Sequence, residues 1–69
     1  MARGIEYWAT GPYGPHGRIL IQTPSFRKAL HTAVEKAEKS GDTIIVEQYE
    51  RDETGFWNST GDVWKIKVS

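Results

Sequence analysis

An apolar stripe at the helical period runs through the middle of the chain. Between positions 26 and 37 the apolar residues recur every three or four positions, which puts them on one face of an α-helix. The stripe consists of Phe26, Ala29, Leu30, Ala33, Val34 and Ala37. Charged and polar residues occupy most positions between them. The pattern predicts an amphipathic helix over residues 24–40 that packs on a sheet, and its three alanines predict a close approach between the two.

Residues that favour helix termini stand at both ends of this segment. Thr23 can cap the N-terminus with Pro24 at the first helical position, where the missing N–H costs nothing. Ser25 is an alternative cap. Gly41 suits the left-handed conformation that ends many helices.

Four segments around the helix have the composition of β-strands. Residues 5–10, 19–21, 44–50 and 63–68 are rich in β-branched and aromatic side chains. In the last segment Trp64, Ile66 and Val68 face one way, and Val63, Lys65 and Lys67 face the other. Lysines on one side are typical of an edge strand with a solvated surface.

This order of elements predicts an α+β fold. We expect an antiparallel β-sheet of about four strands in ββαββ order, with the one amphipathic α-helix packed on one face. The predicted core consists of Phe26, Leu30, Val34, Ile19, Ile21, Ile45, Trp64 and Ile66.

The length of 69 residues predicts a single domain over residues 1–69. The sequence has no cysteine, which excludes disulfides and thiolate metal sites, and its two histidines lack the spacing of a zinc site. We therefore expect no cofactor and no metal. Because the sequence contains neither a long apolar run nor a signal peptide, we expect no membrane contact and a cytoplasmic location.

The net charge of zero hides a division along the chain. Residues 1–40 carry six basic and three acidic residues, a net of +3, whereas residues 41–69 carry three basic and six acidic residues, a net of −3. An overall balance argues against a generic nucleic-acid binder, which usually has a basic excess.

Nothing in the sequence predicts catalysis. Asp52, Glu53 and Asp62 lie in one loop region, but neighbouring acids in a turn are ordinarily solvated. The glycines at positions 11 and 14 alternate with prolines, which lack the N–H donors of a phosphate-binding loop. We therefore expect that the protein is not an enzyme.

Two glycine-containing loops carry the candidate binding residues. Residues 11–17 and 52–62 present aromatic side chains beside backbone that a partner can approach closely. The candidate residues are Tyr13, His16, Trp57 and Asn58. We expect a protein partner, or a second copy of the chain, to contact these loops and an adjoining sheet edge. Two alternatives are open: Trp57 folds back onto the core, or sheet and loop aromatics bind nucleic acid together with Arg and Lys.

In the order of its elements the chain resembles several small phage and bacterial proteins. The shared features are two strands, Thr23-Pro24-Ser25-Phe26 at the start of an alanine-spaced helix, the strand Thr43-Ile44-Ile45-Val46, and a closing strand that contains Trp64. Some anti-CRISPR inhibitors, which occupy a surface of a host effector, belong to this group. The resemblance implies a small inhibitor or adaptor that occupies the surface of a host protein complex. It assigns no functional residue.

Overall fold

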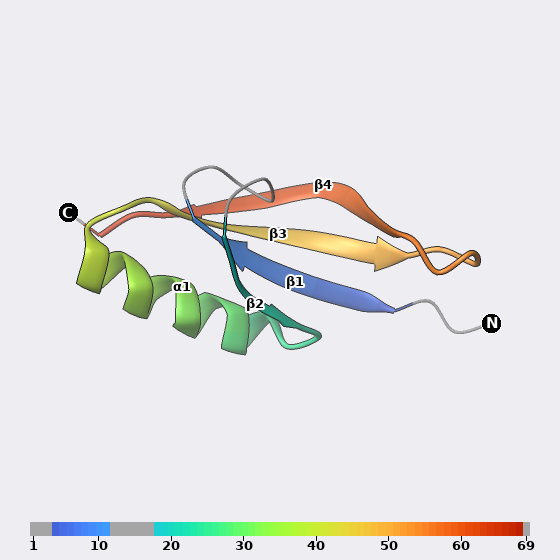
Figure 1. Cartoon of the computed structure of the whole chain (residues 1–69), viewed down its shortest axis with the longest axis horizontal. Coiled ribbons are helices and arrows are strands. Elements are labelled where there is room, and N and C mark those ends of the chain that lie inside the picture. The colour runs from blue at the N-terminus through green and yellow to red at the C-terminus, as the bar shows by residue number, and fades with distance from the viewer. Residues whose placement is uncertain (1–3, 12–17, 69) are drawn as a thin grey trace.

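Four antiparallel strands form one sheet, and a single helix packs on one face of it (Figure 1). The computed structural model describes residues 4–11 and 18–68. The elements are β1 (Ile5–Thr10), β2 (Ile19–Thr23), α1 (Phe26–Ser40), β3 (Ile44–Arg51) and β4 (Trp57–Ile66). This confirms the predicted α+β fold and its ββαββ order.

The strand order in the sheet is β2-β1-β3-β4. Both β2 and β3 are antiparallel to β1, so they run parallel to each other on either side of it. The connection between them crosses one face of the sheet, and α1 is that connection. This topology places the helix against β2, β1 and β3 and makes β2 and β4 the outermost strands.

The helix begins at Phe26, two residues later than predicted, and Ser25 is its N-cap. The Ser25 hydroxyl accepts a hydrogen bond from the backbone N–H of Lys28 at 3.3 Å. Thr23 is not the cap, because it ends β2 and its hydroxyl accepts from the N–H of Ser25 at 3.1 Å. Gly41 ends the helix as predicted, with a φ of 75° and its N–H bonded to the carbonyl of Ala37 at 2.8 Å.

Small residues occupy the contact between helix and sheet. The buried cluster consists of Ala9, Ala29, Ala33, Ala37, Ile44 and Val46. Because an alanine side chain ends at Cβ, the three helix alanines bring α1 close to the sheet, as predicted. Around this cluster lie the partly buried side chains of Tyr7, Leu20, Ile21, Phe26, Trp64 and Ile66.

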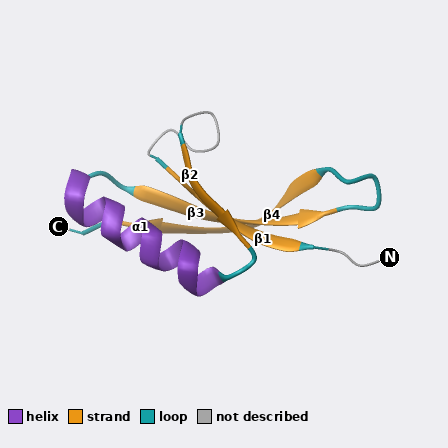
Figure 2. Ribbon diagram, turned by 60° about the horizontal axis from the view of Figure 1, so that its bottom comes forward, coloured by secondary structure: helices purple, strands orange, loops and turns teal. Residues whose placement is uncertain are grey.

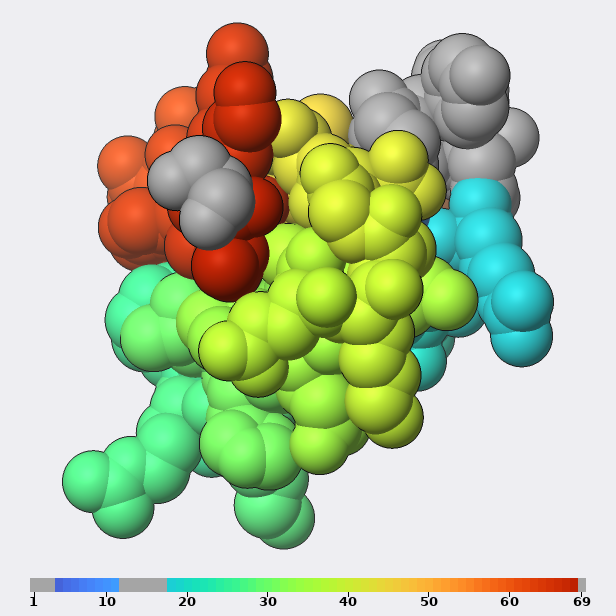
Figure 3. Space-filling model, turned by 90° about the vertical axis from the view of Figure 1, so that its left-hand side faces the viewer, coloured from blue at the N-terminus to red at the C-terminus, as the bar shows by residue number. Residues whose placement is uncertain are grey.

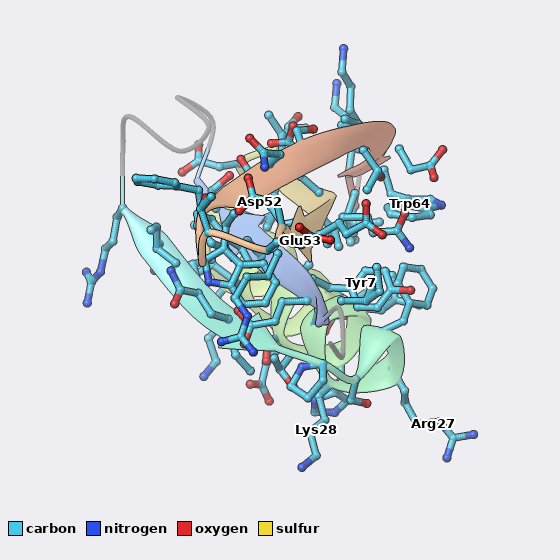
Figure 4. All side chains as sticks on the ribbon, turned by 90° about the vertical axis from the view of Figure 1, so that its right-hand side faces the viewer. Tyr7, Arg27, Lys28, Asp52, Glu53 and Trp64 are labelled. Atoms are coloured by element: carbon cyan, nitrogen blue, oxygen red, sulfur yellow. The ribbon has the colours of Figure 1, made fainter. Side chains whose placement is uncertain are left out.

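Three aromatic rings pack together near the N-terminal end of α1. The Phe26 ring centroid lies 5.1 Å from that of Tyr7 and 4.8 Å from that of Trp64. Figure 4 shows Tyr7 and Trp64 on the same side of the molecule, near the helix. Their edge-to-face and tilted geometries are the ones that aromatic quadrupoles favour. The prediction that Trp64 belongs to the core is confirmed.

Four residues of the predicted core lie outside both the buried cluster and the side chains packed against it. Ile19 is 39% exposed, and Ile45 is half-buried and points to the face of the sheet away from α1. Pairing with β1 sets this register, because Ala9 stands opposite Val46 and both face the helix. Ile44 and Val46 therefore fill the core in place of Ile45. Phe26, Ile21, Trp64 and Ile66 pack against the core as predicted, whereas Leu30 and Val34 are half-buried and belong to neither group.

Beyond the core, β4 differs from the prediction at both of its ends. It begins at Trp57 rather than at position 63, and Val68 lies outside it and is 38% exposed. The last turns of α1 and the C-terminal end of β4 lie at the same end of the molecule and share one surface there (Figure 3). Within residues 4–11 and 18–68, no helix is long and apolar enough to cross a membrane.

Candidate functional site

The hairpin formed by β3 and β4 extends well beyond the helix (Figure 1, Figure 2). A helix of 15 residues is about 22 Å long, whereas a strand of 10 residues reaches about 33 Å. In addition, β2 pairs with β1 only from Tyr7 onward, so the far part of the sheet has three strands. We call residues 47–60 of this hairpin the arm. Neither α1 nor β2 extends along its outer end.

A network of hydrogen bonds to Asp52 fixes the end of the arm, residues 52–56, which we call the tip. One carboxylate oxygen of Asp52 accepts from the N–H and hydroxyl of Thr54, at 2.9 and 2.6 Å, and from the N–H of Phe56 at 3.1 Å. Its other oxygen accepts from the side-chain amide of Asn58 at 3.0 Å. The turn contains Gly55, whose φ of 93° suits glycine.

The same hydrogen bonds change the acidity of this carboxyl group. Donation by Thr54 and then by Asn58 lowers the pKa of Asp52 from 3.8 to about 2, because these bonds stabilise the charged form. Asp52 therefore remains ionised throughout the neutral and mildly acidic range. Glu53, next to it, is exposed, and Figure 4 shows both acids on the hairpin, while Arg27 and Lys28 extend outward from the helix.

Phe56 stands at the end of the tip and is 71% exposed. It is the most exposed large apolar residue among those that the structure describes. Its backbone is held on both sides of the Cα atom, since its N–H donates to the Asp52 carboxylate and its carbonyl accepts from the Asp52 N–H at 2.9 Å. The tip thus presents an aromatic ring to solvent from a backbone that is already ordered.

A second group of aromatic rings, which we call the outer cluster, supports the arm on the face away from α1. Trp8 stacks on Tyr49 with ring centroids 4.0 Å apart, and Trp57 meets Trp8 at 6.5 Å in an edge arrangement. The Arg51 guanidinium carbon lies 5.6 Å from the centre of the Trp57 ring. A side chain at Gly4 would come within 3.2 Å of that ring. These contacts join β1, β3 and β4 where no helix covers them.

Two carboxylates border the outer cluster. Glu47 accepts hydrogen bonds from the hydroxyls of Tyr49 and Ser59, at 3.0 and 2.7 Å, and Glu6 accepts from the Trp8 indole N–H at 3.2 Å. Burial, followed by the hydrogen bond to Glu47 and the charge of that group, raises the pKa of Tyr49 to about 12. The outer cluster is therefore a packed, acid-bordered group of rings and not a row of free stacking surfaces.

The four residues predicted to bind a partner are placed as follows. Trp57 is half-buried in the outer cluster, so it folds back on the sheet, although on the face opposite to the main core. Asn58 is exposed. Its side-chain amide donates to Asp52 and to the carbonyl of Phe56 at 3.4 Å, and these hydrogen bonds stabilise the tip. Tyr13 and His16 lie outside the described residues.

The sequence reasoning did not select Phe56, which the structure makes the most prominent side chain of this region. Its signal is the spacing from Asp52. An aspartate that starts a turn commonly receives N–H groups from the residues that follow it, and Phe56 is the last residue of that turn. Trp57, in contrast, is the first residue of β4, so its side chain lies on one face of the sheet.

Neither a metal site nor an enclosed cavity appears among residues 4–11 and 18–68. No three or more His, Asp or Glu side chains of these residues come together to hold an ion, and no pocket opens between them. The chain was compared with protein-family models, with curated proteins and with solved structures, and nothing matches it.

Proposed function

We propose that the protein is a small, non-catalytic binding module that contacts a protein partner with the tip of its arm. The single observation that carries this proposal is Phe56, a 71% exposed ring on a backbone fixed by Asp52. Fully burying a phenylalanine side chain contributes about 1.5–3 kcal/mol. Binding through an ordered turn also avoids most of the entropy that a flexible loop loses.

The chemistry of the tip indicates what kind of surface the partner presents. A pocket that accepts an aromatic ring is apolar, and aromatic side chains are prominent among the residues that dominate interface energies. The resemblance in element order makes a host protein complex bound by a phage or mobile-element inhibitor the first partner to test.

Nucleic-acid binding through the sheet aromatics is a second candidate, supported by the Arg51 guanidinium beside Trp57. Trp8 and Tyr49, however, each have one ring face covered by the other, and Tyr49 is only 8% exposed. The carboxylates of Glu6 and Glu47 lie at the same rings and would repel phosphate. The geometry therefore favours a protein partner.

Affinity capture from a lysate of the organism that carries this sequence tests the proposal. We expect the wild-type chain to retain a specific protein that Phe56→Ser loses. Val63→Ser is the matched control, because Val63 is 45% exposed but lies in the other half of β4. Retention that is equal for all three chains would overturn the proposal.

Binding of single- and double-stranded oligonucleotides across a salt series separates the second candidate from the first. Phosphate contacts release counterions, so such binding weakens steeply as salt rises. A tight, salt-sensitive complex that does not depend on Phe56 would replace the protein-binding proposal with nucleic-acid binding.

A further inference from the structure

The two halves of the edge strand β4 differ in how well they are protected against pairing with another strand. In the second half, Val63 stands opposite Glu47 while Ser59 stands opposite Tyr49, so residues 60–62 form a bulge opposite a single residue of β3. Gly61 adopts a φ of 93° there, and Lys65 follows. Bulges and lysines are the devices by which proteins keep edge strands from pairing.

The first half of β4 has none of these devices. Trp57, Asn58 and Ser59 pair with β3 in regular register, and positions 56–61 contain no charged residue and no proline. On the opposite side, β1 forms the edge of the arm only at Ile5 and the charged Glu6, and β2, which covers the rest of β1, is only five residues long. It also has a bulge, since Ala9 pairs with Ile21 but Thr10 pairs with Ile19. The outer edge of the arm is thus the least protected edge in the described sheet.

The hydrogen-bond pattern shows which backbone groups point outward from this edge. The Asp52 N–H donates to the Phe56 carbonyl, and in an antiparallel pair hydrogen-bonded positions alternate with non-bonded ones. Trp57 and Ser59 therefore direct their N–H and C=O groups away from β3. The Arg51 N–H supports this alternation, because it donates to Gly4 of the β1 chain at 2.9 Å and not toward Trp57.

We propose that an extended segment of the partner adds to the arm as a fifth strand, paired with the backbone of Trp57 and Ser59. This inference rests on the proposed function. It adds the backbone edge of the arm, next to Phe56, to the surface that contacts the partner. A residue of the added strand directly opposite Trp57 would lie on the same face as its ring, so a β-branched or aromatic residue fits there. Side chains on such a strand supply specificity, while the main-chain bonds supply affinity.

A peptide segment fits this edge better than a second copy of the chain. The unprotected stretch ends where the bulge of residues 60–62 begins, and two outward-facing residues offer few backbone hydrogen bonds. A symmetric contact limited to two paired residues of each chain supplies little of the roughly 1,000 Å² that a stable interface between folded proteins buries. A short extended segment needs no more edge than this.

A displayed library of random linear peptides, selected on the wild-type chain, tests the inference without knowledge of the natural partner. Ser59→Pro removes an outward N–H and leaves the backbone hydrogen bonds to β3 in place. Because it also removes the hydroxyl that donates to Glu47, Ser59→Ala, which keeps the N–H, is the control for that loss. Lys65→Pro is the matched control, because alternation directs its N–H outward in the protected half of the same strand. We expect enriched peptides to bind wild type and Lys65→Pro equally and to bind Ser59→Pro at least about tenfold more weakly.

Amide hydrogen exchange on the wild-type chain gives a readout that does not depend on a folded variant. Peptide binding should slow the exchange of the Trp57 and Ser59 amides. Failure to enrich peptides, equal binding by Ser59→Pro, or unchanged exchange at both amides would each overturn the inference. Self-association that Ser59→Pro abolishes would overturn it too, in favour of a second copy.

These outcomes are distinguishable from failure of the proposed function. If Phe56→Ser abolishes capture of a protein while no peptide adds to the edge, the tip binds alone and the inference falls. If peptides protect the Trp57 and Ser59 amides but capture does not depend on Phe56, the edge binds a partner and the proposed contact through Phe56 is wrong.

Discussion

The indole of Trp8 lies on the ring of Tyr49, with 4.0 Å between centroids and 22° between ring planes. The two residues come from neighbouring strands and lie on the face of the sheet away from α1. Their stacking, with Trp57 at its edge, leaves Tyr49 only 8% exposed in a part of the molecule that no helix covers. The arm thus has a small core of its own, and this allows the tip to project without losing its order.

We expect Trp8→Ala to destabilise the protein by about 2–4 kcal/mol, because it removes a half-buried aromatic side chain and the stacked pair. Chemical denaturation followed by circular dichroism measures the loss. Lys65→Ala, an exposed position on the same face, should change the free energy of unfolding by no more than about 0.5 kcal/mol. Equal stability of the two variants would show that the outer cluster does not support the fold.

The tip should lose stability in acid. The folded pKa of Asp52, about 2, lies below its ordinary value of 3.8, so ionised Asp52 favours the folded state above pH 4. That contribution declines as the pH falls from about 4 toward 2, where the folded carboxyl group takes up its proton. Asp52→Asn should therefore be less stable than wild type at pH 7, and the difference should shrink by pH 2. Denaturation at stepped pH checks this, and a constant difference would contradict it.

The alanine contact between α1 and the sheet should not tolerate larger side chains. Ala33 is fully buried against the sheet, so Ala33→Leu should cost about 1–3 kcal/mol or more through overpacking. Lys36→Leu places the same side chain on an exposed position of the same helix and is the control. Thermal melts of both variants test the contact, and a melting temperature of Ala33→Leu equal to that of wild type would mean that the helix does not pack closely.

Periodicity in the sequence accounts for most of the fold. The helix stripe and the alternation after Val63 each have a definite period, and the structure confirms the helix and the inward side of Trp64 and Ile66. The run Ile44-Ile45-Val46 has no alternation, so its inward face could not be read from the residues. Pairing with Ala9 decides it, and this is a contact between strands far apart in the sequence.

The candidate site was predictable only in part, for a related reason. The sequence indicates that aromatic residues gather around position 57. It does not show which of the two adjacent rings, Phe56 or Trp57, packs on the sheet. Which ring packs and which is exposed depends on where β4 begins and on the hydrogen bonds to Asp52. The partner-binding role of Tyr13 and His16 stays a prediction.

Phe56 and Trp57 are neighbours in sequence, and we expect their substitution to have opposite effects. Phe56→Ala removes an exposed ring and should change the free energy of unfolding by no more than about 0.5 kcal/mol. Trp57→Ala opens the outer cluster and should cost about 2 kcal/mol or more. For binding to the captured partner, Phe56→Ala should cost about 2 kcal/mol or more, as interface aromatics typically do. Denaturation and titration calorimetry on the same preparations measure both quantities. A Phe56→Ala chain that is destabilised but binds normally would show that Phe56 supports the fold and does not contact the partner.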